Sequence, residues 1–124
     1  MARSIFFFNE DESMRRLAVA VFSAFSAEVI ALGLNEYLFN GYPSRISGGD
    51  IVVVGGGFKE GETIGLTLVQ MFLRRRRALH GNLTVIIFSG ASASVATPFG
   101  DDVVFVPKEG NMWPLIRAVE KALG

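Results

Sequence analysis

Hydrophobic residues gather in five short runs along the chain. Each run is rich in Val, Ile or Phe and is bounded by Gly, Ser, Asn or charged residues. Continuous apolar runs of strand length are typical of strands that are buried on both faces of a sheet. The pattern therefore predicts five buried strands, at Ser4–Phe8, Glu28–Leu32, Ile51–Val54, Leu83–Phe88 and Val103–Val106.

The segments between these runs carry apolar residues at helical spacing. In the first, Leu17, Val21 and Phe22 recur on one side, as expected of an amphipathic helix that packs on a sheet. The same spacing predicts helices over about Ser13–Ser26, Glu62–Leu79 and Met112–Leu123.

Two other segments are interrupted by Gly and Pro. Gly41 and Pro43 limit a helix after the second strand to about Asn35–Asn40. Pro98 and Gly100 leave room for a single helical turn between the fourth and fifth strands, so we expect that helix to be short or absent.

Strands that alternate with helices over short connections form right-handed βαβ crossovers, which make the sheet parallel and place helices on both of its faces. The expected fold class is α/β, a single-domain three-layer sandwich that spans residues 1–124 and contains a five-stranded parallel sheet. Ligands of such sheets bind at the carboxyl ends of the strands, near the point where strand order reverses. Function is therefore expected near residues 9–12, 55–58, 89–91 and 106–108.

Composition argues against several classes of function. The 12 Lys and Arg residues balance 12 Asp and Glu residues, so the net charge gives no reason to expect nucleic acid or an anionic membrane as partner. One His and no Cys argue against a zinc site and a thiol nucleophile. No apolar run reaches the roughly 18 residues of a membrane span, and the first run is too short for a signal-peptide core. We expect a cytoplasmic protein with no metal or other cofactor.

Three stretches combine an apolar strand with a particular polar flank. They are Phe6-Phe7-Phe8-Asn9-Glu10-Asp11-Glu12 followed by Ser13-Met14-Arg15, then Val85-Ile86-Ile87-Phe88-Ser89-Gly90, and Asp101-Asp102-Val103-Val104-Phe105-Val106-Pro107. Taken in order, nearly the whole chain resembles the receiver domain of bacterial two-component response regulators. This resemblance implies a flavodoxin-like sheet with the strand order 2-1-3-4-5.

The resemblance also implies a phosphoacceptor pocket in which essential groups are replaced. The family's phosphoacceptor Asp follows the third strand, where this chain has Gly55, so no carboxylate is available to form an aspartyl phosphate. Val106 stands at the position of the lysine that pairs with the phosphoryl group, and Lys108 lies two places later.

Of the remaining positions of this degenerate pocket, some match the family's residues and one is replaced. Asn9 replaces the first of the two acids that bind Mg²⁺ in the family, whereas Glu10 retains the second. Ser89 fits the switch hydroxyl at the end of the fourth strand. If the register is shifted by one residue, Glu10 and Asp11 would form the acid pair of a residual Mg²⁺ site. Asp50 is rejected as a nucleophile because it precedes its strand and so lies at the opposite edge of the sheet, roughly 16 Å away.

A glycine run follows the third strand. Backbone N–H groups of such loops can hold phosphate, but Gly55-Gly56-Gly57 is not followed by Gly-Lys-Ser or Gly-Lys-Thr. The run is interpreted as a flexible turn.

In receivers, the fourth helix, fifth strand and last helix form a common partner or dimer face. The corresponding surface here would carry Phe105, Pro107, Lys108, Met112 and Trp113. Aromatic residues and Met are enriched at interfaces, which makes this surface a candidate for binding a protein partner or a second copy. Equally, Trp113 could simply cap the core.

These observations lead us to expect a phosphorylation-independent protein-interaction module, a pseudo-receiver, in bacterial signal transduction or regulation. We expect no enzymatic activity. Two alternatives stay open: an atypical but active phosphoacceptor receiver, and a small-molecule-binding flavodoxin-like domain that uses the glycine run and Ser89.

Overall fold

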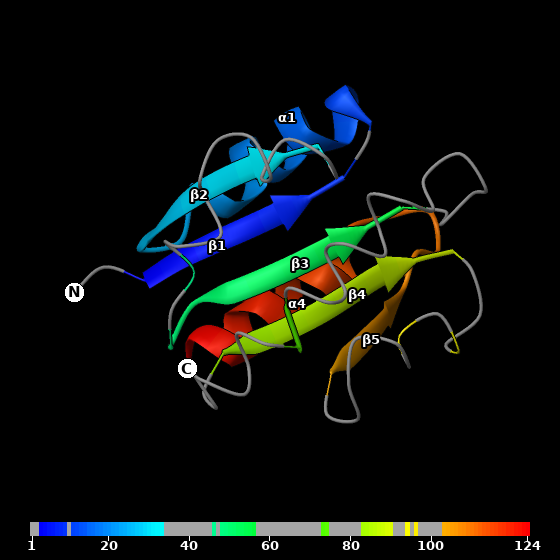
Figure 1. The fold of residues 1–124 in the computed structure, drawn as a ribbon. Coiled ribbons are helices and arrows are strands. Elements are labelled where there is room, and N and C mark those ends of the chain that lie inside the picture. Colours follow the sequence, from blue (N-terminus) through cyan, green and yellow to red (C-terminus); the bar gives the residue numbers. More distant parts are fainter. Residues whose placement is uncertain are drawn as a thin grey trace.

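The computed structural model describes residues 3–9, 11–33, 46, 48–56, 73–74, 83–90, 94, 96 and 103–124. All five predicted strands are confirmed to within one residue at each end. They are β1 (Arg3–Phe8), β2 (Ala27–Leu32), β3 (Ile51–Gly55), β4 (Thr84–Ser89) and β5 (Val104–Pro107). Two helices lie within the described ranges, α1 (Glu12–Phe22) and α4 (Trp113–Leu123) (Figure 1).

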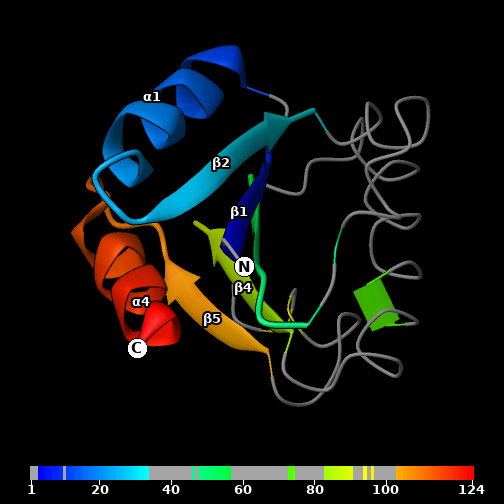
Figure 2. The ribbon, with the colours of Figure 1, turned by 90° about the vertical axis from the view of Figure 1, so that its left-hand side faces the viewer.

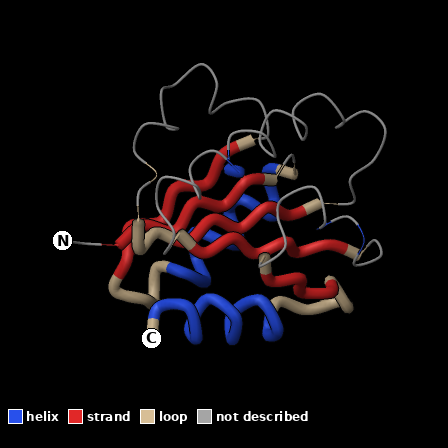
Figure 3. Tube along the Cα trace, turned by 60° about the horizontal axis from the view of Figure 1, so that its bottom comes forward, coloured by secondary structure: helices blue, strands red, loops and turns tan. Residues whose placement is uncertain are grey.

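The strands form one parallel sheet in the order β2-β1-β3-β4-β5, which confirms the expected topology. Figure 3 shows the strands side by side, with α4 running along the sheet toward the C-terminus. The strand order reverses between β1 and β3, so the carboxyl ends of these two strands flank the expected ligand-binding position.

The aromatic run of β1 supplies the centre of the core. Successive side chains of a strand point to opposite faces, so Ile5 and Phe7 pack on one face of the sheet and Phe6 and Phe8 on the other. All four are buried. A central strand with core on both faces explains why this run contains no polar residue.

Helices α1 and α4 cover the same face of the sheet (Figure 2). Ala18 and Phe22 of α1 and Leu115 and Val119 of α4 are buried there. Leu17 does not belong to the buried stripe predicted from the sequence: it is 44% exposed. The buried residues of α1 are instead Ala18 and Phe22, which are four residues apart and therefore lie on one side of the helix.

The second core cluster lies on the opposite face of the sheet. There, Ile46, Leu73, Leu83 and Ala96 join the side chains of the strands. Leu73 and Arg74 have helical backbone and fall within the helix predicted over Glu62–Leu79. The rest of that helix, the predicted Asn35–Asn40 helix and most of residues 91–100 lie outside the described residues.

Helix α1 ends four residues before the predicted end at Ser26. The N–H of Ser23 still bonds the carbonyl of Val19, at 3.1 Å, but the N–H of Phe25 bonds the carbonyl of Phe22 in a turn, at 3.0 Å. The rings of Phe22 and Phe25 stack with centroids 6.2 Å apart. Phe25 therefore packs on the core cluster beneath α1 because this turn places it there, and not because the helix continues to it.

Arg3 ties the start of β1 to the end of α4. Its Nη1 and Nη2 donate to the carbonyls of Leu123 and Ala122, at 2.7 and 3.0 Å, and its Nε donates to the carbonyl of Gly49 at 2.7 Å. The last carbonyls of a helix lack partners within the helix, and a cation there also compensates the helix dipole. This contact fixes the end of α4 beside the start of β1, at the amino ends of the strands and away from the expected site.

None of the described helices is long and apolar enough to cross a membrane.

Candidate functional site

The carboxyl ends of the central strands bring together most of the residues that the sequence singled out. Asn9 follows β1, Gly55 ends β3 and Ser89 ends β4. Gly55 lies opposite Phe88 in the β3–β4 register, and Phe88 lies opposite Val106 in the β4–β5 register. Glu10 is outside the described residues, so its predicted place in the pocket stays a prediction.

A close approach between Asn9 and Gly55 defines the centre of this edge. A Cβ atom added to Gly55 would lie 2.9 Å from Nδ2 of Asn9, closer than real Cβ atoms approach a neighbour. It would also lie 3.5 Å from the carbonyl oxygen of Phe88 and 3.6 Å from Cζ of Phe7. A side chain at position 55 would therefore require the Asn9 amide to shift, because Nδ2 of Asn9 occupies the adjoining space.

Asn9 is held in place on several sides. It is only 3% exposed, and its backbone N–H donates to the carbonyl of Leu32 at 2.9 Å. Its Oδ1 accepts a hydrogen bond of 2.8 Å from the N–H of Asp11, and its carbonyl accepts one of 2.8 Å from Nη1 of Arg15. With Oδ1 already bonded locally, the amide cannot turn away from Gly55 without losing a hydrogen bond.

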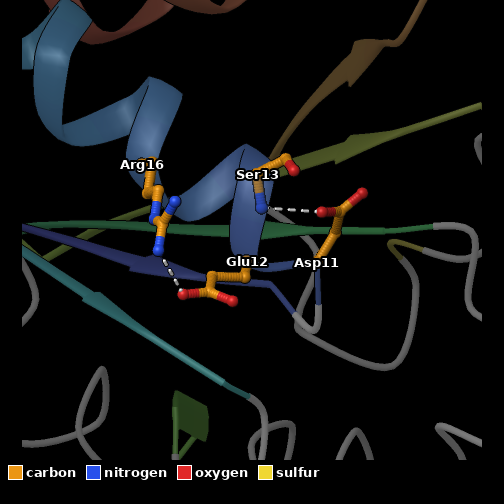
Figure 4. A network of polar contacts seen from close by, with 4 residues as sticks. All are labelled: Asp11, Glu12, Ser13 and Arg16. Atoms are coloured by element: carbon orange, nitrogen blue, oxygen red, sulfur yellow. Dashed lines mark hydrogen bonds and ion pairs between the residues drawn. The ribbon is translucent and has the colours of Figure 1, made fainter.

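Asp11 acts as the N-cap of α1. Its Oδ1 accepts a hydrogen bond of 2.8 Å from the N–H of Ser13 (Figure 4), which satisfies one of the free donors at the start of the helix. Glu12, the first residue of α1, forms an exposed ion pair of 2.8 Å with Arg16, one turn further along the helix. This arrangement directs Oδ1 of Asp11 to the helix start, and the shifted register in which Asp11 would join Glu10 at a metal stays a prediction.

The described residues include no cluster of three or more His, Cys, Asp or Glu side chains that could hold a metal ion. The N–H of Gly56 donates to the carbonyl of Phe88 at 3.2 Å, so this donor of the glycine run is used within the sheet. Gly57 lies outside the described residues.

Ser89 and Val106 are both buried, but Ser89 is polar whereas Val106 is apolar. Ser89 is fully buried, and its carbonyl accepts a hydrogen bond of 2.9 Å from the N–H of Lys108. Val106 packs with Phe88 in the core cluster under α1 and α4. The position where receivers carry a lysine is thus filled by an apolar side chain that belongs to the core.

Asp50 lies at the opposite edge of the sheet, as the sequence indicated. It is buried, and its Oδ1 accepts a hydrogen bond of 3.0 Å from the N–H of Ser4, next to the start of β1. Its own carbonyl accepts one of 3.1 Å from the N–H of Thr84, at the start of β4. Asp50 therefore stabilises the strand starts.

The predicted interaction surface is only partly exposed. Trp113 is 64% exposed, so the alternative that it caps the core is wrong. Pro107 and Lys108 are exposed, whereas Phe105 and Met112 pack partly against the two core clusters.

Sequence reasoning missed Val104 on this surface. Its run was interpreted as a buried strand, but Val104 is 44% exposed. In the observed order β5 is an edge strand, and only Val106 of its four residues is buried. Only the position of β5 at the sheet edge, which the resemblance implied, could have indicated this exposure.

Comparison with known proteins supports the fold. No protein-family model and no curated protein matches the chain. Among solved structures, a response regulator receiver protein from Sinorhizobium medicae is similar, with a TM-score of 0.72 and 17% identity over 98% of this chain and 94% of that one. A response regulator from Thermotoga maritima gives a TM-score of 0.68 and 16% identity over 99% and 98% of the two chains.

A cobalamin-binding protein from Desulfitobacterium hafniense is also similar, with a TM-score of 0.60 and 16% identity over 99% of this chain and 60% of that one. At these identities the likeness concerns the fold alone. The fold is that of response regulator receiver domains.

The contact between Asn9 and Gly55 predicts an energetic coupling between the two positions. We expect Gly55→Ala to lower the free energy of unfolding by about 1–2 kcal/mol, because Asn9 must move and give up a hydrogen bond. In an Asn9→Ala background the same substitution should cost about 1 kcal/mol less. Urea denaturation of the four variants measures both quantities.

Gly90→Ala is the matched control for this cycle. Among the described residues, a Cβ at Gly90 would meet no atom closer than the carbonyl oxygen of Lys108, at 3.9 Å, so its cost should be small and independent of Asn9. Equal costs of Gly55→Ala in both backgrounds would contradict the contact.

Proposed function

We propose that this chain is a pseudo-receiver, a phosphorylation-independent protein-interaction module of bacterial signal transduction or regulation without enzymatic activity. The observation that carries the proposal is the Asn9–Gly55 contact. A side chain at position 55, such as a phosphoacceptor carboxylate, would have to displace the neutral amide of Asn9 that fills the adjoining space.

The chemistry of phosphoryl transfer supports the proposal. An aspartyl phosphate requires a carboxylate nucleophile, and Gly55 has none. Mg²⁺ takes oxygen ligands in a tight octahedral arrangement, but Asn9 turns its nitrogen toward Gly55 and uses its Oδ1 to accept from Asp11. Val106 offers no cation to pair with a phosphoryl group. Each missing group would have to be supplied by another side chain.

Binding of a protein partner or a second copy would then account for the exposed apolar residues near the fifth strand. Trp113, Val104 and Pro107 come from β5 and the start of α4 and present apolar surface. Trp is enriched among residues that dominate binding energies. A cytoplasmic location and the absence of nucleic acid among the partners belong to the same proposal, since the net charge is zero.

The pocket is expected not to respond to a mimic of the aspartyl phosphate. In amide NMR spectra of the full chain, Mg²⁺ with beryllofluoride should leave the signals of Asn9, Gly55, Ser89 and Val106 unchanged, because Gly55 offers no carboxylate to bind the beryllium. Mg²⁺ alone is the control for effects of ionic strength. Saturable shifts at stoichiometric beryllofluoride would contradict the proposal and favour an active receiver.

Trp113→Ala is expected to weaken association about tenfold or more and to change the free energy of unfolding by less than about 0.5 kcal/mol, because the side chain is mostly exposed. Sedimentation velocity over a concentration series measures self-association. If the chain stays monomeric, capture of a partner from bacterial lysate replaces that readout.

Val19→Ala is the control for the Trp113 variant. Val19 is also an exposed apolar residue, 41% exposed, but it lies on α1. The proposed surface is wrong if the two variants associate equally well.

A further inference from the structure

A cavity of about 330 Å³ lies between α1 and the connection from β5 to α4. Met14, Leu17 and Val21 of α1 form one wall, and Met112 contributes to the other. Phe88, at the end of β4 and 1% exposed, also lines it, so the cavity reaches down to the sheet. Both bordering helices lie on the same face of the sheet (Figure 2).

The cavity is separate from the strand-end pocket of Asn9 and Gly55, neither of which lines it. Its volume falls at the small end of the range of about 300–1,000 Å³ that is usual for small-molecule sites. Its walls are mainly apolar, and among its described lining residues Lys108 carries the single charge. A cation beside apolar walls suits a molecule with an apolar body and one anionic end.

The backbone fixes the position of Lys108. Its N–H donates to the carbonyl of Ser89 at 2.9 Å, which continues the pairing of β4 with β5 by one residue. Side chains two residues apart on an extended chain lie on the same side. Val106 faces the α1 and α4 side of the sheet, so Lys108 follows it on that side and lines the cavity there.

The β5–α4 connection leaves the cavity open to entering molecules. Gly110 has φ of 88°, and among the described residues beyond its chain neighbours no atom lies within 4 Å of the place where its Cβ would be. Leu17, on the opposite wall, is partly exposed. The apolar wall is thus in contact with solvent, and covering it with an apolar ligand would be favourable.

We propose that this cavity binds a small organic anion with an apolar body, of the class of medium-chain carboxylates. The apolar chain lies against Met14, Leu17 and Phe88, and the carboxylate pairs with the ammonium group of Lys108. This site is independent of phosphorylation, and it shares Lys108 and Met112 with the predicted interaction surface.

Titration of the full chain with octanoate, followed by methyl and amide NMR, tests the proposal. We expect saturable shifts of the Met14, Val21 and Met112 methyl groups and of the Lys108 amide. Octanol, which has the same chain without the charge, should bind at least about tenfold more weakly, since that is the factor a charge-assisted hydrogen bond contributes.

Two variants test separately the contribution of the Lys108 charge and that of the cavity volume. Lys108→Met should weaken octanoate about tenfold and leave octanol unchanged, because it removes only the ammonium group. Lys121→Met is the matched control, since Lys121 is exposed near the far end of α4 and should not alter either affinity. Val21→Phe should fill the cavity and abolish binding of both probes, with a thermal melt to verify that the variant folds.

Three outcomes would overturn the proposal. They are the absence of saturable shifts in the parent chain, equal binding of octanoate and octanol, and an unchanged octanoate affinity in Lys108→Met. None of them bears on the strand-end pocket, so the proposed pseudo-receiver function is tested separately.

Discussion

The closeness of Asn9 to Gly55 is the constraint on which the chemistry of this fold depends. Adjacent parallel strands β1 and β3 end at the same edge of the sheet, so the residues after them compete for one small volume. Here the amide of Asn9 takes that volume, and it is held there by hydrogen bonds to the end of β2 and the start of α1. A nucleophilic side chain at position 55 would therefore have to displace the Asn9 amide.

Most of the described core and polar contacts stabilise the sheet and its helices. The Phe run of β1 fills the core on both faces, Asp11 caps α1 immediately after Asn9, and Arg3 and Asp50 join the elements at the opposite edge. Polar and charged groups that might have served chemistry are used instead to stabilise helix and strand ends. The described residues also present accessible apolar groups, at Trp113 and in the cavity beside Lys108. A domain built in this way is suited to binding.

The short Val, Ile and Phe runs, separated by segments of helical spacing, predicted the five strands and their parallel arrangement correctly, and the resemblance to receivers supplied their order. The sequence placed the end of α1 too late, since Phe25 fits helical spacing but reaches its position through a turn that stacks it on Phe22. It could identify Gly55 and Asn9 as replaced positions, but not their contact, which depends on the register of strands 46 residues apart in sequence, as between Ile5 and Ile51. The exposure of Val104 and Trp113 depends in the same way on tertiary neighbours that no local pattern records.

Intact-mass spectrometry of the full chain after incubation with acetyl phosphate and Mg²⁺ tests the central claim most directly. With glycine at position 55 and the Asn9 amide beside it, the account predicts that the mass stays that of the unmodified chain. An acid-labile gain of one phosphoryl group, mapped by borohydride reduction to an acidic residue at the carboxyl edge of the sheet, would contradict it and identify a working phosphoacceptor.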